Sequence, residues 1–137
     1  MANMTEEVME LFNSQSAAKV LATADSKGSI HVLPHGSIMA IAPDKIAFAK
    51  LVKGKTWDNL EKTKNASVTA FILSQKPGES KGYQVKGACE GIQSSGELYD
   101  SYQSKMPPNM KIAGAGIISV EEVYDVSPGP NCGKRLD

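Results

Sequence analysis

Short β-forming segments dominate this sequence, and most of them are joined by turns rather than by helices. Ala18–Ala24 is a compact apolar run, Asp25–Gly28 is a turn signal, and Ser29–Leu33 follows as a second extended segment, which together predict a β-hairpin. No strand–helix–strand alternation runs through the chain, and this disfavours a parallel, doubly wound sheet. The pattern therefore favours an antiparallel barrel with a few helices at its ends.

Pro34 and Gly36 interrupt the second strand, which continues through Ser37–Ala42. A proline and a glycine inside a strand mark a bulge, or a place where a ligand closely approaches the backbone. With this interrupted strand counted once, we predict six strands. The later ones are Lys45–Leu51, Ala66–Leu73, Tyr83–Ile92 and Ala113–Val126. Helices are predicted over residues 5–15 with Thr5 as the N-cap, over Thr56–Lys64, and from a capping box at Ser94–Glu97 to Met106.

Size and charge limit the class of protein. The 137 residues fit a single domain over 1–137, with an irregular tail over 127–137. Fifteen basic residues balance fifteen acidic ones, which argues against a nucleic-acid or membrane-surface partner. No apolar run reaches the roughly 20 residues that span a bilayer. The acidic N-terminus lacks the basic region of a signal peptide, so we expect a cytoplasmic protein.

Cysteine and histidine are scarce. With two of each and no Cys-x-x-Cys pair, the sequence predicts neither a disulfide framework nor a metal site. Cys89 lies in a strand and is expected to be a small buried side chain. It is not expected to be a nucleophile, because its neighbour Glu90 would raise the pKa of a thiol. Cys132 is expected to be a free thiol in the tail. His31 fits a surface or interface position better than a ligand.

Lysines gather in one part of this neutral chain. Six of them fall within the twenty residues from Lys45 to Lys64. Within this stretch a strand ends, Gly54 permits a turn, and Lys55 and Thr56 stand where a helix begins. Free backbone N–H groups at a helix N-terminus, together with a lysine and a hydroxyl, suit a phosphate. The alternative is a solvated lysine beside an ordinary threonine cap. A nucleotide-triphosphate P-loop is excluded because Ala49 replaces its first glycine and no parallel α/β unit is present.

The order and spacing of four short pieces resemble the FMN-binding split-barrel family typified by pyridoxamine phosphate oxidase. The pieces are Ala22-Thr23-Ala24-Asp25 with Gly28, His31-Val32-Leu33-Pro34, Lys55-Thr56 with Asn59-Leu60, and Gln84-Val85-Lys86-Gly87-Ala88. The resemblance covers roughly residues 5–125 and is strongest to the small FMN-binding proteins of the family. It implies a six-stranded antiparallel split β-barrel.

The resemblance also implies a cofactor site. Lys55 and Thr56 would hold the FMN phosphate, Lys50 would reach the phosphate or the ribityl chain, and Asn59 lies one helical turn beyond Lys55. The isoalloxazine ring would lie along two segments, Pro34, His35, Gly36 and Ser37 on one and Leu51, Val52 and Lys53 on the other. A second copy of the chain would complete the pocket, so the resemblance implies a homodimer. From the residues alone, His35 is either a hydrogen-bond donor to the ring edge or a loop residue.

Several functions stay open. The chain is much shorter than true pyridoxamine phosphate oxidases, so vitamin B6 oxidation is not expected, and the match of Arg135-Leu136 to an Arg-Leu pair of those enzymes is two residues long. We expect an FMN-dependent oxidoreductase or electron-transfer protein, with Lys53 or a partner-chain lysine favouring the reduced, anionic flavin. The alternatives are a non-enzymatic FMN-binding module, a deazaflavin or haem on the same fold, and a barrel without ligand. The electron donor, the acceptor and the substrate are not predicted.

Overall fold

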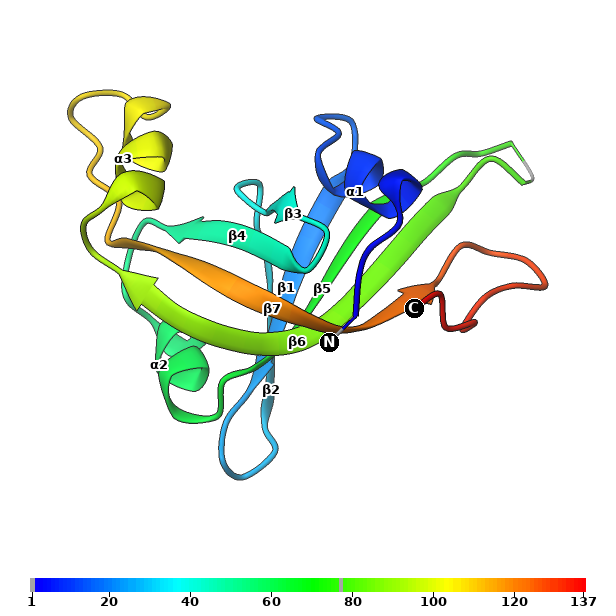
Figure 1. The fold of residues 1–137 in the computed structure, drawn as a ribbon, viewed down its shortest axis with the longest axis horizontal. Helices are drawn as coiled ribbons and strands as arrows, with labels where there is room; N and C mark the ends of the chain where they lie inside the picture. The colour runs from blue at the N-terminus through cyan, green and yellow to red at the C-terminus, as the bar shows by residue number, and fades with distance from the viewer. Residues whose placement is uncertain (1, 77) are drawn as a thin grey trace.

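The computed structural model describes residues 2–76 and 78–137 and shows one antiparallel sheet with three helices (Figure 1). The helices are α1 (Glu6–Phe12), α2 (Lys55–Lys62) and α3 (Glu97–Ser104). The strands are β1 (Ala18–Ala24), β2 (Ile30–Pro34), β3 (Met39–Ala42), β4 (Lys45–Lys50), β5 (Asn65–Ile72), β6 (Lys81–Gln93) and β7 (Gly114–Asp125). None of the helices within these residues is long and apolar enough to cross a membrane.

The prediction of six strands is wrong, because the described part of the chain contains seven. The strand order is β2-β1-β5-β6-β7-β4-β3, so β2 and β3 follow each other in sequence yet occupy opposite edges of the sheet. Pro34 and Gly36 therefore mark a crossing from one edge to the other and not a bulge within one strand. We name residues 35–38, which make this crossing, the edge-to-edge link.

The edge-to-edge link forces the sheet to curl. Seven strands laid flat would separate the outer strands by about 29 Å. The five residue steps from Pro34 to Met39 span at most about 18 Å. The sheet must therefore bend until its edges approach. It is not closed into a complete barrel, because β2 and β3 form no ladder with each other among the described residues.

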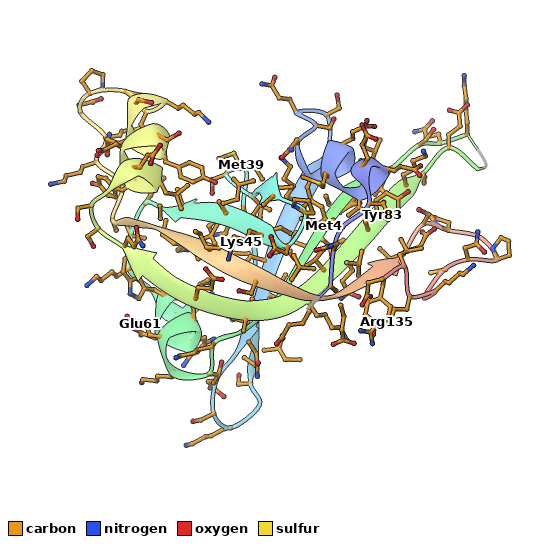
Figure 2. All side chains as sticks on the ribbon, viewed as in Figure 1. Met4, Met39, Lys45, Glu61, Tyr83 and Arg135 are labelled. Carbon is orange, nitrogen blue, oxygen red and sulfur yellow. The ribbon has the colours of Figure 1, made fainter. Side chains whose placement is uncertain are left out.

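The concave face of the sheet holds the main hydrophobic core. Thr5 caps α1 by accepting a hydrogen bond from the N–H of Val8, and Val8 and Phe12 on the inner face of α1 are fully buried. They pack in one cluster with strand residues that include Leu21, Phe48, Val68, Val85, Ile118 and Val123. Figure 2 shows the side chains crowded between α1 and the sheet, with Met4 among them, whereas Glu61 on α2 points outward.

A second, smaller cluster lies beneath α3 and contains Ala47, Tyr99, Tyr102, Ile112 and Ala115. The predicted capping box is wrong here. The N-cap of α3 is Gly96, at a φ of 109°, with no side-chain cap, and the Ser94 hydroxyl donates instead to the carbonyl of Ala113. A glycine is required at this φ, which explains why the helix starts after Gly96 and not at Ser94.

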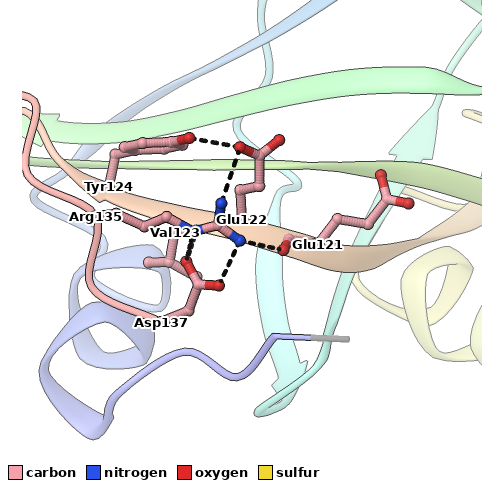
Figure 3. Close-up of polar contacts among 6 residues, drawn as sticks. All are labelled: Glu121, Glu122, Val123, Tyr124, Arg135 and Asp137. Atoms are coloured by element: carbon pink, nitrogen blue, oxygen red, sulfur yellow. Dashed lines mark hydrogen bonds and ion pairs between the residues drawn. The ribbon is translucent and has the colours of Figure 1, made fainter.

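The tail over 127–137 loops out after β7 (Figure 1), and its end returns to that strand (Figure 3). Arg135 forms an isolated bridge with Tyr124, and its guanidinium pairs with Asp137 at 2.9 Å and with Glu122 at 3.5 Å. The Asp137 carboxylate also accepts from the N–H of Val123, and these contacts lower the pKa of Asp137 to about 2. The end of the tail is therefore pinned to the edge of β7.

The close approach of β7 to Gly87 predicts a severe effect on stability. A Cβ on Gly87 of β6 would overlap the carbonyl oxygen of Ser119 on β7, whereas a Cβ on Gly36 would meet no atom within 4 Å. We expect Gly87→Ala to lower the free energy of unfolding by about 3 kcal/mol, because the strands must separate to admit the methyl group. Gly36→Ala is the matched control and should change it by less than about 0.5 kcal/mol. Urea unfolding measures both, and equal stabilities would contradict the close packing of β6 on β7.

Candidate functional site

A groove of about 830 Å³ opens between the edge-to-edge link, the end of β4 and the end of α3. Its volume falls in the range of small-molecule and cofactor sites. Seven of the eleven residues predicted to bind the cofactor line it, namely Pro34, His35, Gly36, Ser37, Lys50, Leu51 and Val52. The rest of its lining is Asn13, Gln15, Lys19, Leu33, Ile38, Met39, Ala40, Ala49, Tyr102, Lys105, Met106 and Ile112.

Hydrogen bonds fix the edge-to-edge link as the floor of the groove. The N–H of His35 donates to the carbonyl of Lys19 on β1 at 2.9 Å. The Ser37 hydroxyl accepts from the N–H of Ala49 at 2.9 Å and donates to the carbonyl of the same residue at 3.0 Å, so it takes the place of a strand partner for β4. Tyr102 on α3 donates its hydroxyl to the carbonyl of Ser37 at 2.7 Å. The link is therefore tied to both sheet edges and to α3.

Gly36 leaves open space at the centre of this floor. It is exposed, it lines the groove, and a Cβ placed on it would meet no other atom within 4 Å. Packing within this chain therefore does not require a glycine here. A flat ligand lying against the backbone would require one, because a side chain would occupy the same space.

Lys50 is a buried cation in the wall of the groove. It is the last residue of β4, its exposed fraction is 7%, and burial lowers the pKa of its ammonium group. Among the described residues no carboxylate lies within 4 Å of its Nζ, and its one polar side-chain contact is with His35 Nε2 at 3.4 Å. Burying an ammonium group without a counter-ion costs folding free energy, so we expect an anion to bind beside Lys50.

His35 is neutral beside Lys50. Burial and the charge of Lys50 lower the pKa of the imidazole to about 4. Because the ammonium group can only donate, Nε2 must be the acceptor and Nδ1 must carry the proton. Nδ1 lies 3.4 Å from the Ser37 hydroxyl, which can accept that proton as a hydrogen bond. Sequence reasoning left His35 between a ligand contact and a loop residue, and the structure places it in the edge-to-edge link, where it lines the groove.

The charged side chains that line the groove are all positive. Three lysines line it, Lys19, Lys50 and Lys105, whereas no aspartate or glutamate among the described residues does. Lys19 is half-buried on β1, and burial lowers its pKa. In a chain of zero net charge this excess is local, and it favours an anionic ligand.

Four predicted residues lie outside this groove, at and near the start of α2. Lys53 Nζ lies over the Trp57 ring, 5.1 Å from its centroid, and Lys55 Nζ is 3.7 Å from the carboxylate of Asp25. Asn59 is buried and donates to the Thr23 hydroxyl at 3.0 Å. Thr56 is also buried, and its hydroxyl has no hydrogen-bond partner within the described residues.

The first turn of α2 has the chemistry of an anion site. Gly54 is its N-cap and supplies no side-chain cap, so the first backbone N–H groups of the eight-residue helix need other partners. Lys55 is more than half exposed beside them. The orphaned Thr56 hydroxyl is a second, independent sign of a missing partner, because buried hydroxyls are nearly always hydrogen-bonded.

Sequence reasoning missed the wall that α3 contributes. Tyr102, Lys105, Met106 and Ile112 come from α3 and the segment after it, and Asn13 and Gln15 follow α1. The sequence predicted a helix that ends at Met106, but nothing local indicates which part of the sheet this helix covers. Burial raises the pKa of the Tyr102 phenol, so it remains a hydrogen-bond donor to the link.

Arg135 and the cysteines take no part in the groove. Arg135 is held by Asp137 and Glu122 on the β7 side of the tail. Cys89 is buried, as expected, and burial raises the pKa of its thiol, whereas Cys132 is exposed in the tail. Neither cysteine lines the groove.

The neutral His35 predicts a pH dependence of stability. Its pKa is about 4 in the folded protein and 6.5 in the unfolded chain, so the unfolded state binds more protons between these values. The free energy of unfolding should therefore fall as the pH falls through this window, by about 2 kcal/mol between pH 7 and pH 5. Urea unfolding of His35→Gln should lack this loss, with His31→Gln as the control. If the free energy of unfolding depends on pH equally in the wild type and in His35→Gln, the imidazole is not buried and neutral.

Comparison with known proteins places the chain among relatives. An uncharacterized protein of Methanocaldococcus jannaschii is 25% identical over 97% of this chain and 87% of its own length. The solved structure of HupZ from Group A Streptococcus is 25% identical, covers 95% of this chain and 99% of its own, and superposes with a TM-score of 0.74. An FMN-binding protein from Syntrophomonas wolfei is 19% identical over 89% of this chain and 85% of its own, with a TM-score of 0.78.

The same fold occurs in proteins named for other cofactors. A structure described as an F420 reductase is 14% identical, with a TM-score of 0.67 over 88% of this chain and 98% of its own. A heme binding protein from Mycobacterium smegmatis is 12% identical, with a TM-score of 0.65 over 96% of this chain and 58% of its own. The family model of pyridoxamine 5'-phosphate oxidase matches residues 4–126. This chain therefore belongs to the pyridoxamine 5'-phosphate oxidase family, as the sequence motifs predicted.

Proposed function

We propose that this protein binds FMN, with the ring in the groove and the phosphate at the first turn of α2, and that it acts as an oxidoreductase or electron-transfer protein. The observation that carries the proposal is the groove itself. Its floor is open at Gly36, and its wall holds the buried, unpaired ammonium group of Lys50. A flat, anionic cofactor matches both features.

The two parts of the site lie close enough for one ligand. Val52 lines the groove and Lys55 begins α2, so their α-carbons are three residue steps and at most about 11 Å apart. The exposed Lys55, the free N–H groups of the first turn and the unpartnered Thr56 hydroxyl would hold the phosphate. Lys55 would have to share its charge between the phosphate and Asp25.

The residues of this chain would bind and orient the cofactor. When bound, FMN would supply the redox chemistry. The edge-to-edge link offers exposed backbone groups around Gly36. Its surface is fixed, because Ser37 and His35 form hydrogen bonds with the neighbouring strands and with Tyr102 of α3. Lys50 supplies positive charge in the wall.

A second copy of the chain would cover the groove. Leu51 and Val52 line the groove with exposed fractions of 47% and 68%, and Ile30 and Val32 on the edge strand β2 are exposed at 74% and 54%. Exposed apolar side chains, such as Leu51 and Val52 beside the groove and Ile30 and Val32 elsewhere on the surface, are typical of an interface. These residues support a homodimer in which the partner contributes to the cofactor site.

Two alternatives share the fold. A deazaflavin or haem could occupy the groove instead of FMN, and structural neighbours are named for F420 and for haem. A non-enzymatic FMN-binding module would bind the flavin without turning over any electron donor. The absorption spectrum separates the cofactors, and turnover with reduced nicotinamides separates the enzyme from the binding module.

The first test is the visible spectrum of the purified protein after it is mixed with FMN and the excess is removed. We expect flavin bands near about 370 and 450 nm in the protein fraction. The double variant Lys55→Gln/Thr56→Val should bind FMN at least tenfold more weakly and bind riboflavin almost unchanged, because the only cofactor contacts that it removes are those with the phosphate. Lys62→Gln, at the other end of α2, is the matched control. Protein that retains no FMN would refute the proposal.

The floor and the interface are tested separately. Gly36→Val should weaken FMN and riboflavin binding equally, since it fills the floor without disturbing the phosphate site.

Val52→Asp should shift the protein from dimer to monomer in sedimentation velocity and weaken FMN binding at the same time. Leu73→Asp introduces the same charge at a residue that is 76% exposed away from the groove, and it should do neither.

A further inference from the structure

A chain of hydrogen-bonding groups runs from the groove wall into the sheet. Lys50 Nζ faces His35 Nε2 at 3.4 Å, and His35 Nδ1 faces the Ser37 hydroxyl at the same distance. The Ser37 hydroxyl in turn donates to the carbonyl of Ala49 at 3.0 Å. The direction of each hydrogen bond in this series is fixed, because a lysine ammonium can only donate and a carbonyl can only accept. The series holds the Lys50 ammonium in place without neutralising its charge.

The other lysines near the proposed cofactor are engaged elsewhere or are more exposed. Lys53, which the sequence suggested as the charge near the flavin, lies over the Trp57 ring and does not line the groove. Lys105 is exposed and lies over the Tyr102 ring, 5.7 Å from its centroid. Lys19 is only half-buried. Lys50 is the most deeply buried of the three lysines in the groove wall.

A cation buried without a counter-ion favours any ligand state that gains negative charge beside it. Adding two electrons and one proton to an oxidised flavin ring leaves the ring with one negative charge, which is centred on its N1–C2 carbonyl edge. The proposed phosphate site lies outside the groove, at α2, so the phosphate would leave Lys50 free to meet the ring. Low local polarity strengthens such a pairing relative to one at the surface.

We propose that Lys50, held in position by His35, stabilises the negative charge of the reduced flavin and so raises the midpoint potential of the bound cofactor. This inference rests on the proposed FMN site. It gives Lys50, which the resemblance placed at the phosphate or the ribityl chain, the role first expected of Lys53 or a partner-chain lysine. Lys50 would contact the ring, whereas His35 is a positioning residue that acts through Lys50.

The experiment is a potentiometric titration of FMN bound to the intact protein, with dithionite as the reductant and visible absorption as the readout. Lys50→Gln should weaken the binding of reduced FMN at least tenfold relative to oxidised FMN. For a two-electron couple, that tenfold change lowers the midpoint potential by about 30 mV. Lys53→Gln and Lys62→Gln, at residues that do not line the groove, are controls of the same charge change and should keep the wild-type potential. Lys50→Arg should also keep it, since it retains the charge.

Variants of His35 test the same role of Lys50 in a second way. His35→Leu removes the acceptor that faces Lys50 and should lower the potential, whereas His35→Gln, whose amide oxygen can accept from the ammonium, should restore much of it. A purely structural role for His35 would lower stability in both variants without moving the potential. If Lys50→Gln does not fold, the comparison of His35→Leu with His35→Gln tests the proposal alone.

The outcomes distinguish this inference from the proposed function. Wild-type protein that binds no FMN refutes both. FMN binding with an unchanged potential in Lys50→Gln refutes the role of Lys50 and leaves the proposed function standing. An unchanged potential with a loss of discrimination between FMN and riboflavin in Lys50→Gln would show that Lys50 binds the phosphate instead, and this also overturns the inference.

Discussion

Four residues join two strands that lie at opposite edges of a seven-stranded sheet, and the rest of the molecule follows from that constraint. Because the edge-to-edge link is too short to cross a flat sheet, the sheet must curl, and the curl creates the concave face that α1 fills. The same link cannot pair with either edge along its whole length. Its residues instead line the groove, which lies between the two edges and α3.

The hydrogen bonds of the link turn this constraint into a defined surface. The Ser37 hydroxyl substitutes for a missing strand neighbour of Ala49, and Tyr102 ties α3 to the same residue. These contacts are polar and local, yet they connect the sheet with a helix that lies 65 residues further along the chain. The position of α3, and with it one wall of the groove, depends on them.

Much of the fold could be predicted from the sequence. The alternation and turn signals gave β1 with the correct ends, and α1, α2 and β4–β7 to within a few residues. The split of one strand into β2 and β3 could not be predicted, because a proline and a glycine produce similar local signals in a bulge and in a crossing between edges. The start of α3 was misplaced because Ser94 and Glu97 have capping-box spacing, whereas the backbone at Gly96 requires a glycine.

The candidate site was only partly accessible to sequence reasoning. The resemblance to the family pointed to Pro34–Ser37 and Leu51–Val52, and both groups line the groove. The burial of Lys50 against His35, fifteen residues away, depends on the tertiary fold, and so does the contribution of α3. The sequence could not show that Lys53 lies over Trp57, because lysine side chains have many rotamers and only packing selects one.

The openness of the groove floor has an evolutionary consequence. Pro34, Gly36, Leu51 and Val52 contact solvent in this chain and contribute little to the hydrophobic core. Mutations at such positions change what the groove accepts at little cost in folding free energy, so natural selection can alter ligand preference while the scaffold persists. A scaffold whose selectivity and stability reside in separate residues is expected to diversify readily within one lineage.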